Sequence, residues 1–120
     1  MSKVYGYCRV ALANDEEMAE QLYQVYKYCK DNELELHQRF YDNGASGLSL
    51  DRKGLNDMLS VLQKGDVVVT KDISRFARDL MKLEQLVGRI YKIGAEIVYI
   101  DKPEDNDMSP IENWIKSRLG

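Results

Sequence analysis

The stretch DVVVT at residues 66–70 decides the fold class of this sequence. Its three consecutive valines have a polar residue on each side, and such a short apolar run is typical of a β-strand that is buried on both faces. A strand of this kind belongs to a parallel sheet that helices cover on both sides. The flanking sequence should then contain further strands that alternate with helices.

The patterns on either side of this run meet that expectation. Strands are predicted at residues 3–10, 34–41, 66–70 and 96–100. The segment 42–54 is rich in Gly and Ser and too polar to be buried, so it is predicted to be a loop. A second loop, residues 71–79, leads into a helix.

Apolar residues at spacings of three and four predict helices between the strands. The first helix begins at a capping Asn14 or Asp15. Its apolar face is made of Met18, Leu22, Val25, Tyr26 and Cys29.

The remaining helices end at glycines or near the end of the chain. One is predicted at residues 55–64 and is closed by Gly65, and the next ends near Ile93 and is closed by Gly94. An acidic loop is predicted at residues 101–110, followed by a helix at residues 111–119.

This order of elements predicts an α/β fold with a mainly parallel sheet of four to five strands flanked by helices. The chain of 120 residues suffices for one compact domain. Since no internal repeat or linker divides the chain, residues 1–120 are predicted to form a single domain.

Composition narrows the class of protein. Hydrophobic residues make up 44% and charged residues 31% of the chain, an ordinary globular balance. No apolar run has membrane-spanning or signal-peptide character, so we expect a cytoplasmic protein without a membrane partner. The two cysteines, Cys8 and Cys29, lack the spacing of metal ligands and are expected to be buried thiols. His37 is the one histidine in the sequence. No metal or cofactor is therefore expected. The net charge of −3 argues against a domain that binds DNA tightly by itself.

Four arginines lie where ligands bind in such a sheet, beyond the carboxyl ends of the strands. They are Arg9, Arg52, Arg75 and Arg78. Arg75 and Arg78 are three residues apart, so at the start of a helix they would point the same way. Any one of the four could simply pair with a nearby carboxylate, Asp51, Asp72, Asp79 or Glu84. Together they favour an oxyanion site, because the planar guanidinium suits phosphate oxygens.

Four motifs then occur in order: YGYCRVA at residues 5–11, FYDNGASGLSLDRKGL at 40–55, GDVVVTKDISRFARD at 65–79 and NDMSPIENWI at 106–115. On these motifs the chain resembles the N-terminal catalytic domain of the serine recombinases, the resolvase/invertase group. It looks most similar to the large members carried by conjugative transposons and phages. The resemblance covers essentially the whole chain.

The resemblance implies breakage and rejoining of DNA by phosphoryl transfer without a metal, through a phosphoserine linkage. Arg9, Arg52, Arg75 and Arg78 would surround the scissile phosphate. Tyr7 and Gln21 would be secondary contacts at the site. Asp42 would orient the arginines or help move protons, and Ser46 would support the same loop. From the residues alone, Tyr7 could equally be a core residue, Gln21 an exposed helix residue and Ser46 a turn former. The resemblance also implies DNA as partner and a homodimer or tetramer of the full-length protein.

The sequence departs from the family pattern at its nucleophile. The family places its reactive serine two residues after the strand arginine, and this chain has Ala11 there. A methyl group cannot attack phosphorus, so the chain is expected to be inactive in cleavage, whether the alanine is engineered or natural. Ser74 stands where many members carry an acidic residue, and no catalytic role is assigned to it. The chain also stops at Gly120, so it is expected to be truncated before the long family helix and the DNA-binding region.

Two other functions remain open. A domain without a nucleophile could act as an interaction partner that regulates an active recombinase. The chain could also be a flavodoxin-like or receiver-like binding domain unrelated to DNA. A receiver would need an acidic cluster where Arg9 stands, and a nucleotide-binding P-loop would need a GK[ST] motif, which this sequence lacks.

Overall fold

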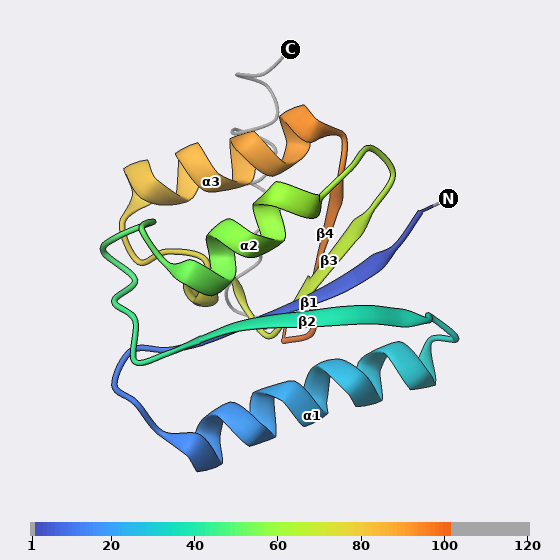
Figure 1. Ribbon diagram of the computed structural model, residues 1–120, viewed down its shortest axis with the longest axis horizontal. Helices are drawn as coiled ribbons and strands as arrows, with labels where there is room; N and C mark the ends of the chain where they lie inside the picture. Colours follow the sequence, from blue (N-terminus) through green and yellow to red (C-terminus); the bar gives the residue numbers. More distant parts are fainter. Residues whose placement is uncertain (1, 102–120) are drawn as a thin grey trace.

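A parallel four-stranded sheet forms the centre of the fold (Figure 1). The computed structural model describes residues 2–101. The strands, in the order β2-β1-β3-β4, are β1 (Val4–Val10), β2 (Leu36–Asn43), β3 (Val67–Thr70) and β4 (Glu96–Tyr99). The helices are α1 (Asp15–Asp31), α2 (Lys53–Val61) and α3 (Leu80–Ile93), with a short 3₁₀ helix, η1 (Ile73–Arg75), after β3. The α/β prediction is confirmed, with four strands in the part of the chain that the structure describes.

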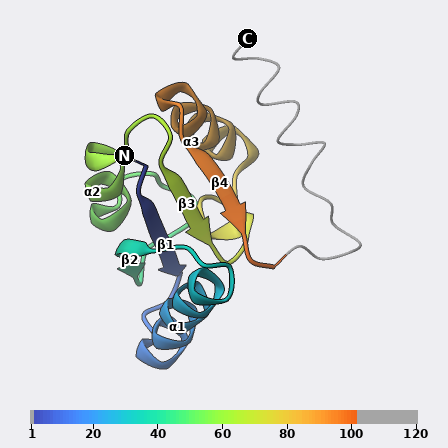
Figure 2. The same ribbon diagram turned by 90° about the vertical axis from the view of Figure 1, so that its right-hand side faces the viewer.

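Strand β3 is buried on both faces, as its valines predicted. Val68 packs in the core between the sheet and helices α2 and α3, and Val69 packs in the core on the α1 side. Figure 2 shows the two layers of helices on opposite sides of the sheet. Since β1 and β4 flank β3 in parallel register, the apolar run lies in the interior of the sheet.

Side chains of β1 alternate between these two cores. Tyr5 and Tyr7 lie in the core on the α2 and α3 side, whereas Cys8 and Val10 lie in the core on the α1 side. Because neighbouring strand residues point to opposite faces, Arg9 shares its face with the two tyrosines. The strand therefore places the guanidinium of Arg9 at the carboxyl end of the sheet, on the side of α2 and η1.

Two predicted elements have wrong boundaries. Strand β2 spans 36–43 instead of 34–41, because Asp42 and Asn43 still pair with Arg9 and Val10 of β1, so Asp42 lies at a strand end and not in the loop. Helix α2 spans 53–61 instead of 55–64, and Gly65 does not close it.

The chain leaves α2 early because Asp66 organises the following turn. The Asp66 carboxylate accepts hydrogen bonds from the backbone N–H of Gln63 (2.8 Å) and of Lys3 (2.9 Å). Gly65 lies inside that turn with φ +89°. Gly94, by contrast, ends α3 in the left-handed conformation, as predicted.

The described residues cover the fold up to the end of β4. The predicted acidic loop from residue 102 onwards and the predicted helix at residues 111–119 lie outside them. Within residues 2–101, no helix combines the length and the apolar character needed to cross a membrane.

The first turn of α2 packs against the backbone at the end of β2, and this contact requires a glycine. A Cβ added to Gly54 would lie 2.2 Å from the carbonyl oxygen of Tyr41, which is backbone and cannot move aside locally. We expect Gly54→Ala to lower the free energy of unfolding by about 2–4 kcal/mol, because the clash outweighs the higher helix propensity of alanine. Urea unfolding tests this. Lys53→Ala, an exposed change in the same turn, should stay within about 0.5 kcal/mol. Equal effects of the two substitutions would contradict the packing argument.

Burial of the Cys8 thiol makes stability depend on pH. Burial raises the pKa of Cys8 to about 12, from an unfolded value near 9.0. Above pH 9 the unfolded chain loses this proton while the folded chain keeps it, so the contribution of Cys8 is full below that pH and is lost as the pH rises towards 12. The difference in unfolding free energy between the parent chain and Cys8→Ala should thus fall by roughly 1 kcal/mol per pH unit above pH 9. Urea titrations at pH 8, 9 and 10 measure it, and a constant difference would rule the mechanism out.

Candidate functional site

Three of the predicted arginines meet at the carboxyl end of the sheet through shared backbone acceptors. The carbonyl oxygen of Arg75 accepts hydrogen bonds from Arg9 Nε (3.0 Å) and from Arg52 Nη1 (3.0 Å). In return, Arg75 Nη1 donates to the carbonyl oxygen of Arg9 (3.2 Å). Residues from β1, from the start of α2 and from η1 are thereby joined at one point.

Arg9 is the most deeply buried member of this cluster, with 1% of its surface exposed. Its Nη1 donates to the carbonyl of Ala45 (2.8 Å) and its Nη2 to the carbonyl of Ser74 (2.7 Å). The guanidinium thus connects the loop after β2 to the loop after β3. Burial, and then the charge of Arg52, lower the pKa of Arg9, so the positive charges here repel one another in a poorly solvated place.

Arg52 is also buried, at 3% exposure, and contacts Tyr7 in two ways. Its Nη1 donates to the Tyr7 hydroxyl (3.1 Å), and its guanidinium carbon lies 5.7 Å from the centroid of the Tyr7 ring. Its Nη2 donates to the carbonyl of Phe76. Its Nε is buried and makes no hydrogen bond within residues 2–101.

Tyr7 and Asp42 connect the arginines to α2. The Tyr7 hydroxyl donates to Asp42 Oδ2 (2.6 Å), and the same carboxylate accepts from the backbone N–H of Gly54 (2.7 Å) and of Leu55 (3.0 Å). Burial, and then the hydrogen bond to Asp42, raise the pKa of Tyr7, so the phenol stays protonated and remains a donor. Asp42 therefore caps α2 while it orients the hydroxyl that Arg52 contacts.

Gln21 is buried on α1, at 1% exposure, and is not the exposed helix residue that its position also allowed. Its Nε2 donates to the carbonyl of Arg9 (3.0 Å), and its Oε1 accepts from the Arg9 backbone N–H (3.3 Å). The amide thus fixes the backbone at the end of β1, directly before Ala11.

Arg75 and Arg78 do not share a helix, which corrects the prediction that they point the same way from a helix start. Arg75 is the last residue of η1, Arg78 follows it, and α3 begins only at Leu80. The reason is that Asp72 caps η1 and Asp79 separately caps α3. The side chain of Arg75 is 14% exposed, and Arg78 is exposed.

Gly47 brings the loop after β2 against two of the arginines. The backbone N–H of Arg78 donates to the Gly47 carbonyl (3.0 Å). A Cβ on Gly47 would lie 2.9 Å from Arg9 Nη2 and 3.0 Å from Arg78 Cγ. A side chain at this position would therefore push against the cluster.

The two remaining predicted site residues lie in loops. Ala11 is exposed in the bend that directly follows β1. Ser46 is exposed, and its hydroxyl accepts from the backbone N–H of Leu48 (3.0 Å), which is the behaviour of a turn former. The structure thus brings the four arginines, Tyr7, Asp42 and Gln21 to one end of the sheet and places Ala11 and Ser46 in the loops of that end.

Sequence reasoning missed several groups at the site. Backbone carbonyls of Ala45, Ser74 and Phe76 accept from the arginines, and no sequence signal identifies such acceptors. It also missed Glu17, whose carboxylate lies 3.8 Å from Arg75 Nη1. Its position one helical turn before Gln21 was the available signal, because residues four apart share a helix face.

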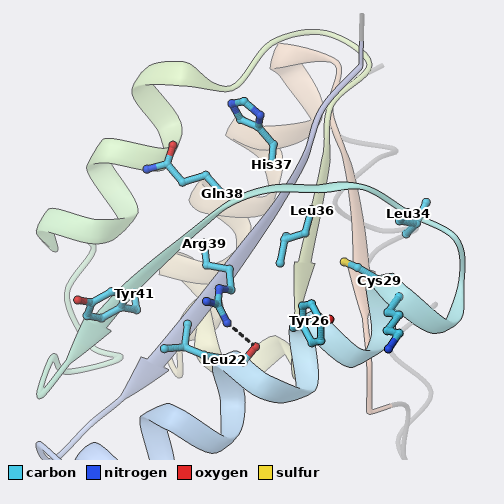
Figure 3. A pocket seen from close by; sticks show the side chains of 10 residues that line it. Leu22, Tyr26, Cys29, Leu34, Leu36, His37, Gln38, Arg39 and Tyr41 are labelled. Carbon is cyan, nitrogen blue, oxygen red and sulfur yellow. Dashed lines mark hydrogen bonds between the residues drawn. The ribbon is translucent and has the colours of Figure 1, made fainter.

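A groove lies between α1 and the edge strand β2, away from the arginines (Figure 3). It has a volume of about 680 Å³. Tyr26 lines this groove and is 48% exposed, so its predicted place on the buried apolar face of α1 is wrong. Across the groove, the Arg39 guanidinium donates a hydrogen bond to the carbonyl of Leu22 (3.1 Å). None of the four arginines of the site lines this groove. Within residues 2–101, no group of three His, Cys, Asp or Glu side chains could hold a metal ion.

The bridge through Tyr7 gives a direct test of the site geometry. Tyr7→Phe removes the hydroxyl between Arg52 and Asp42 but leaves each with its other partners. We expect the free energy of unfolding to fall by about 2–3 kcal/mol, because the hydroxyl loses two buried hydrogen bonds with charged groups, one to Asp42 and one from Arg52. Tyr23→Phe, at a tyrosine that is 58% exposed, is the matched control and should change stability by less than about 0.5 kcal/mol. If both substitutions behave alike in urea unfolding, the hydroxyl bridge does not contribute.

The fold has clear neighbours among solved structures. The N-terminal catalytic domain of TP901-1 integrase superimposes with a TM-score of 0.81 at 21% identity, over 98% of this chain and 93% of that one. The C-terminal catalytic domain of ISC1926 TnpA, an IS607-like serine recombinase, gives a TM-score of 0.75 at 22% identity, over 96% of this chain and 78% of that one. At these identities the similarity shows the fold.

Sequence comparison shows the family. The transposon Tn3 resolvase of Escherichia coli is 30% identical over 119 residues, which cover 98% of this chain and 61% of the resolvase. The transposon Tn501 resolvase of Pseudomonas aeruginosa is 31% identical over 119 residues, which cover 96% of this chain and 57% of the relative. The chain thus spans about three fifths of the length of these relatives. The profile of the family described as resolvase, N terminal domain, matches residues 4–115, and the chain therefore belongs to that family.

Proposed function

We propose that this chain is the catalytic domain of a serine recombinase that acts on DNA in the cytoplasm, and that Ala11 leaves it unable to cleave. One observation carries the proposal. Ala11 is exposed at the end of β1, two residues after the buried Arg9, at the same end of the sheet as Arg52, Arg75 and Arg78. A cluster of guanidinium groups beside an open loop is suited to bind a phosphodiester next to a nucleophile.

A serine at position 11 would complete the chemistry. Its Oγ would form a bond to phosphorus while the bond from phosphorus to the 3′ oxygen breaks, so that the 5′ phosphate becomes linked to the protein. The serine proton is released, and the departing 3′ oxygen takes up a proton. Arginines around the phosphate would stabilise the charge that develops on its oxygens, and the reverse step would rejoin a strand.

The buried and accessible arginines suggest different roles in this reaction. Arg78 is exposed and Arg75 is partly exposed, so these two can meet a phosphate directly. Arg9 and Arg52 give most of their hydrogen bonds to carbonyls and to Tyr7, and we assign them to shaping the site and to its positive potential.

The remaining site residues support this arrangement. Asp42 and Tyr7 orient Arg52, and Gln21 fixes the strand end that carries position 11. Ser46 shapes the loop whose Ala45 carbonyl meets Arg9.

The proposed partners are DNA and further copies of the protein. Relatives named as transposon resolvases, and a structural neighbour named as an integrase, support a role in site-specific recombination. The net charge of −3 supports a division in which most DNA affinity comes from a separate region of the full-length protein, which would act as a dimer or tetramer.

Restoring the nucleophile tests the proposed function. Ala11→Ser is introduced into the full-length product of the gene, which is incubated with supercoiled DNA carrying the ends of the element. A covalent protein–DNA adduct on a denaturing gel is expected with serine and not with alanine. Ala13→Ser, which adds the same hydroxyl two residues further along the same loop, is the matched control and should give no adduct. Absence of an adduct from folded, DNA-bound Ala11→Ser protein would contradict the proposal that Ala11 alone prevents cleavage.

A second function, a regulatory partner of an active recombinase, has one observation in its favour. Large apolar side chains are exposed in segments that border the arginine cluster: Leu12 at 85%, Leu48 at 66% and Met81 at 71%. Apolar surface of this kind favours protein contacts. If Ala11→Ser forms no adduct although the protein is folded and bound to DNA, this second function becomes the better account.

A further inference from the structure

Arg75 lies between two carboxylates from different parts of the chain. Its Nε is 3.6 Å from Asp72 Oδ2, and its Nη1 is 3.8 Å from Glu17 Oε1 on the first turn of α1. Both separations are longer than a hydrogen bond, so the pairs are electrostatic contacts. Consistent with this, the buried Nε of Arg75 makes no hydrogen bond within the described part of the chain.

The two carboxylates differ in how firmly they are placed. Asp72 caps η1, since its Oδ1 accepts from the backbone N–H of Ser74 (3.0 Å) and from the Ser74 hydroxyl. Its position is therefore part of the loop structure. Glu17 has a side chain that is 46% exposed, and within residues 2–101 the contact recorded for its carboxylate is the one to Arg75. Glu17 can swing into solvent without disturbing a cap or a turn.

The surroundings of Arg75 hold an excess of positive charge. Arg52, Arg75 and Arg78 all lower the pKa of Arg9, after the larger effect of burial. The carboxylate of Asp42 is already engaged by the Tyr7 hydroxyl and two backbone N–H groups. Glu17 is thus a negative charge beside the cluster whose side chain holds no cap or turn.

We propose that Glu17 holds the anion position on Arg75 in the free protein and leaves it when a phosphodiester binds. This inference rests on the proposed function, because it assigns a competitor to the same phosphate site. The carboxylate oxygen contacts Arg75 at Nη1, the nitrogen that also donates to the carbonyl of Arg9, two residues before position 11. A phosphate that binds Arg75 at Nη1 therefore competes with Glu17 for the same nitrogen.

The expected change in phosphodiester affinity follows from how exposed the Glu17–Arg75 ion pair is. A half-exposed ion pair contributes about 1 kcal/mol at most, which corresponds to a factor of about five in a binding constant. Removing the competing charge should therefore strengthen phosphodiester binding by about fivefold. A general loss of negative charge on α1 would give a smaller effect that does not depend on which glutamate is changed.

The test compares Glu17→Gln with Glu16→Gln. Glu16 lies in the same first turn of α1 and is exposed, so its substitution removes the same charge and the same interaction with the helix N-terminus without touching Arg75. The probe is thymidylyl-thymidine, a dinucleotide with a single phosphodiester. Its affinity is measured at fixed ionic strength from the shifts of the arginine Nε–Hε resonances.

The outcomes separate this inference from the proposed function. Binding that is about fivefold tighter in Glu17→Gln, with Glu16→Gln within about twofold of the parent, supports the competitor role. Equal affinities of the two variants overturn it while leaving the phosphate site intact. If none of the three proteins binds the dinucleotide, the phosphate site itself is overturned, and the inference fails with it.

Discussion

The guanidinium of Arg9 is the interaction on which the rest of this site depends. It donates to carbonyl oxygens from two loops, one after β2 and one after β3, and both loops carry other site residues. A buried cation without acceptors would be strongly unfavourable, so the two loops must approach closely enough to solvate it. Gly47 permits that approach because it has no side chain to push against Arg9 and Arg78. The loop conformations are thus a consequence of where β1 places one positive charge.

The cluster balances its charges through groups of different mobility. Asp42 is fixed by α2 and by Tyr7, and Asp72 is fixed by η1. Glu17, as far as residues 2–101 show, is held by its long contact with Arg75. Backbone carbonyls supply most of the remaining acceptors. Such a cluster holds a positive potential with little freedom in its buried part and some freedom at its surface.

Much of this arrangement could be predicted from the sequence. The valine run of β3 and the alternation of strands and helices indicate a parallel sheet, and the carboxyl ends of parallel strands meet at one edge, so the arginines that follow them are brought together. The hydrogen bonds of Arg9 and Arg52 could not be predicted, because they depend on the carbonyl directions of η1. The end of α2 was missed for a related reason, since a side chain from the turn before the next strand, Asp66, determines it. Glu17 was missed because its partner is far away in the sequence and the contact depends on how α1 lies against η1.

The double role of Asp42 couples the site to the stability of the whole domain. The same carboxylate caps α2 and receives the hydroxyl that contacts Arg52, while α2 contributes Leu55 and Met58 to the larger core. Opening the Arg52–Tyr7–Asp42 connection at Asp42 therefore also removes two hydrogen bonds from the first turn of α2. The buried half of the site is thereby tied to a helix that packs in the core, and its local fluctuations cost more free energy than those of the exposed Arg78.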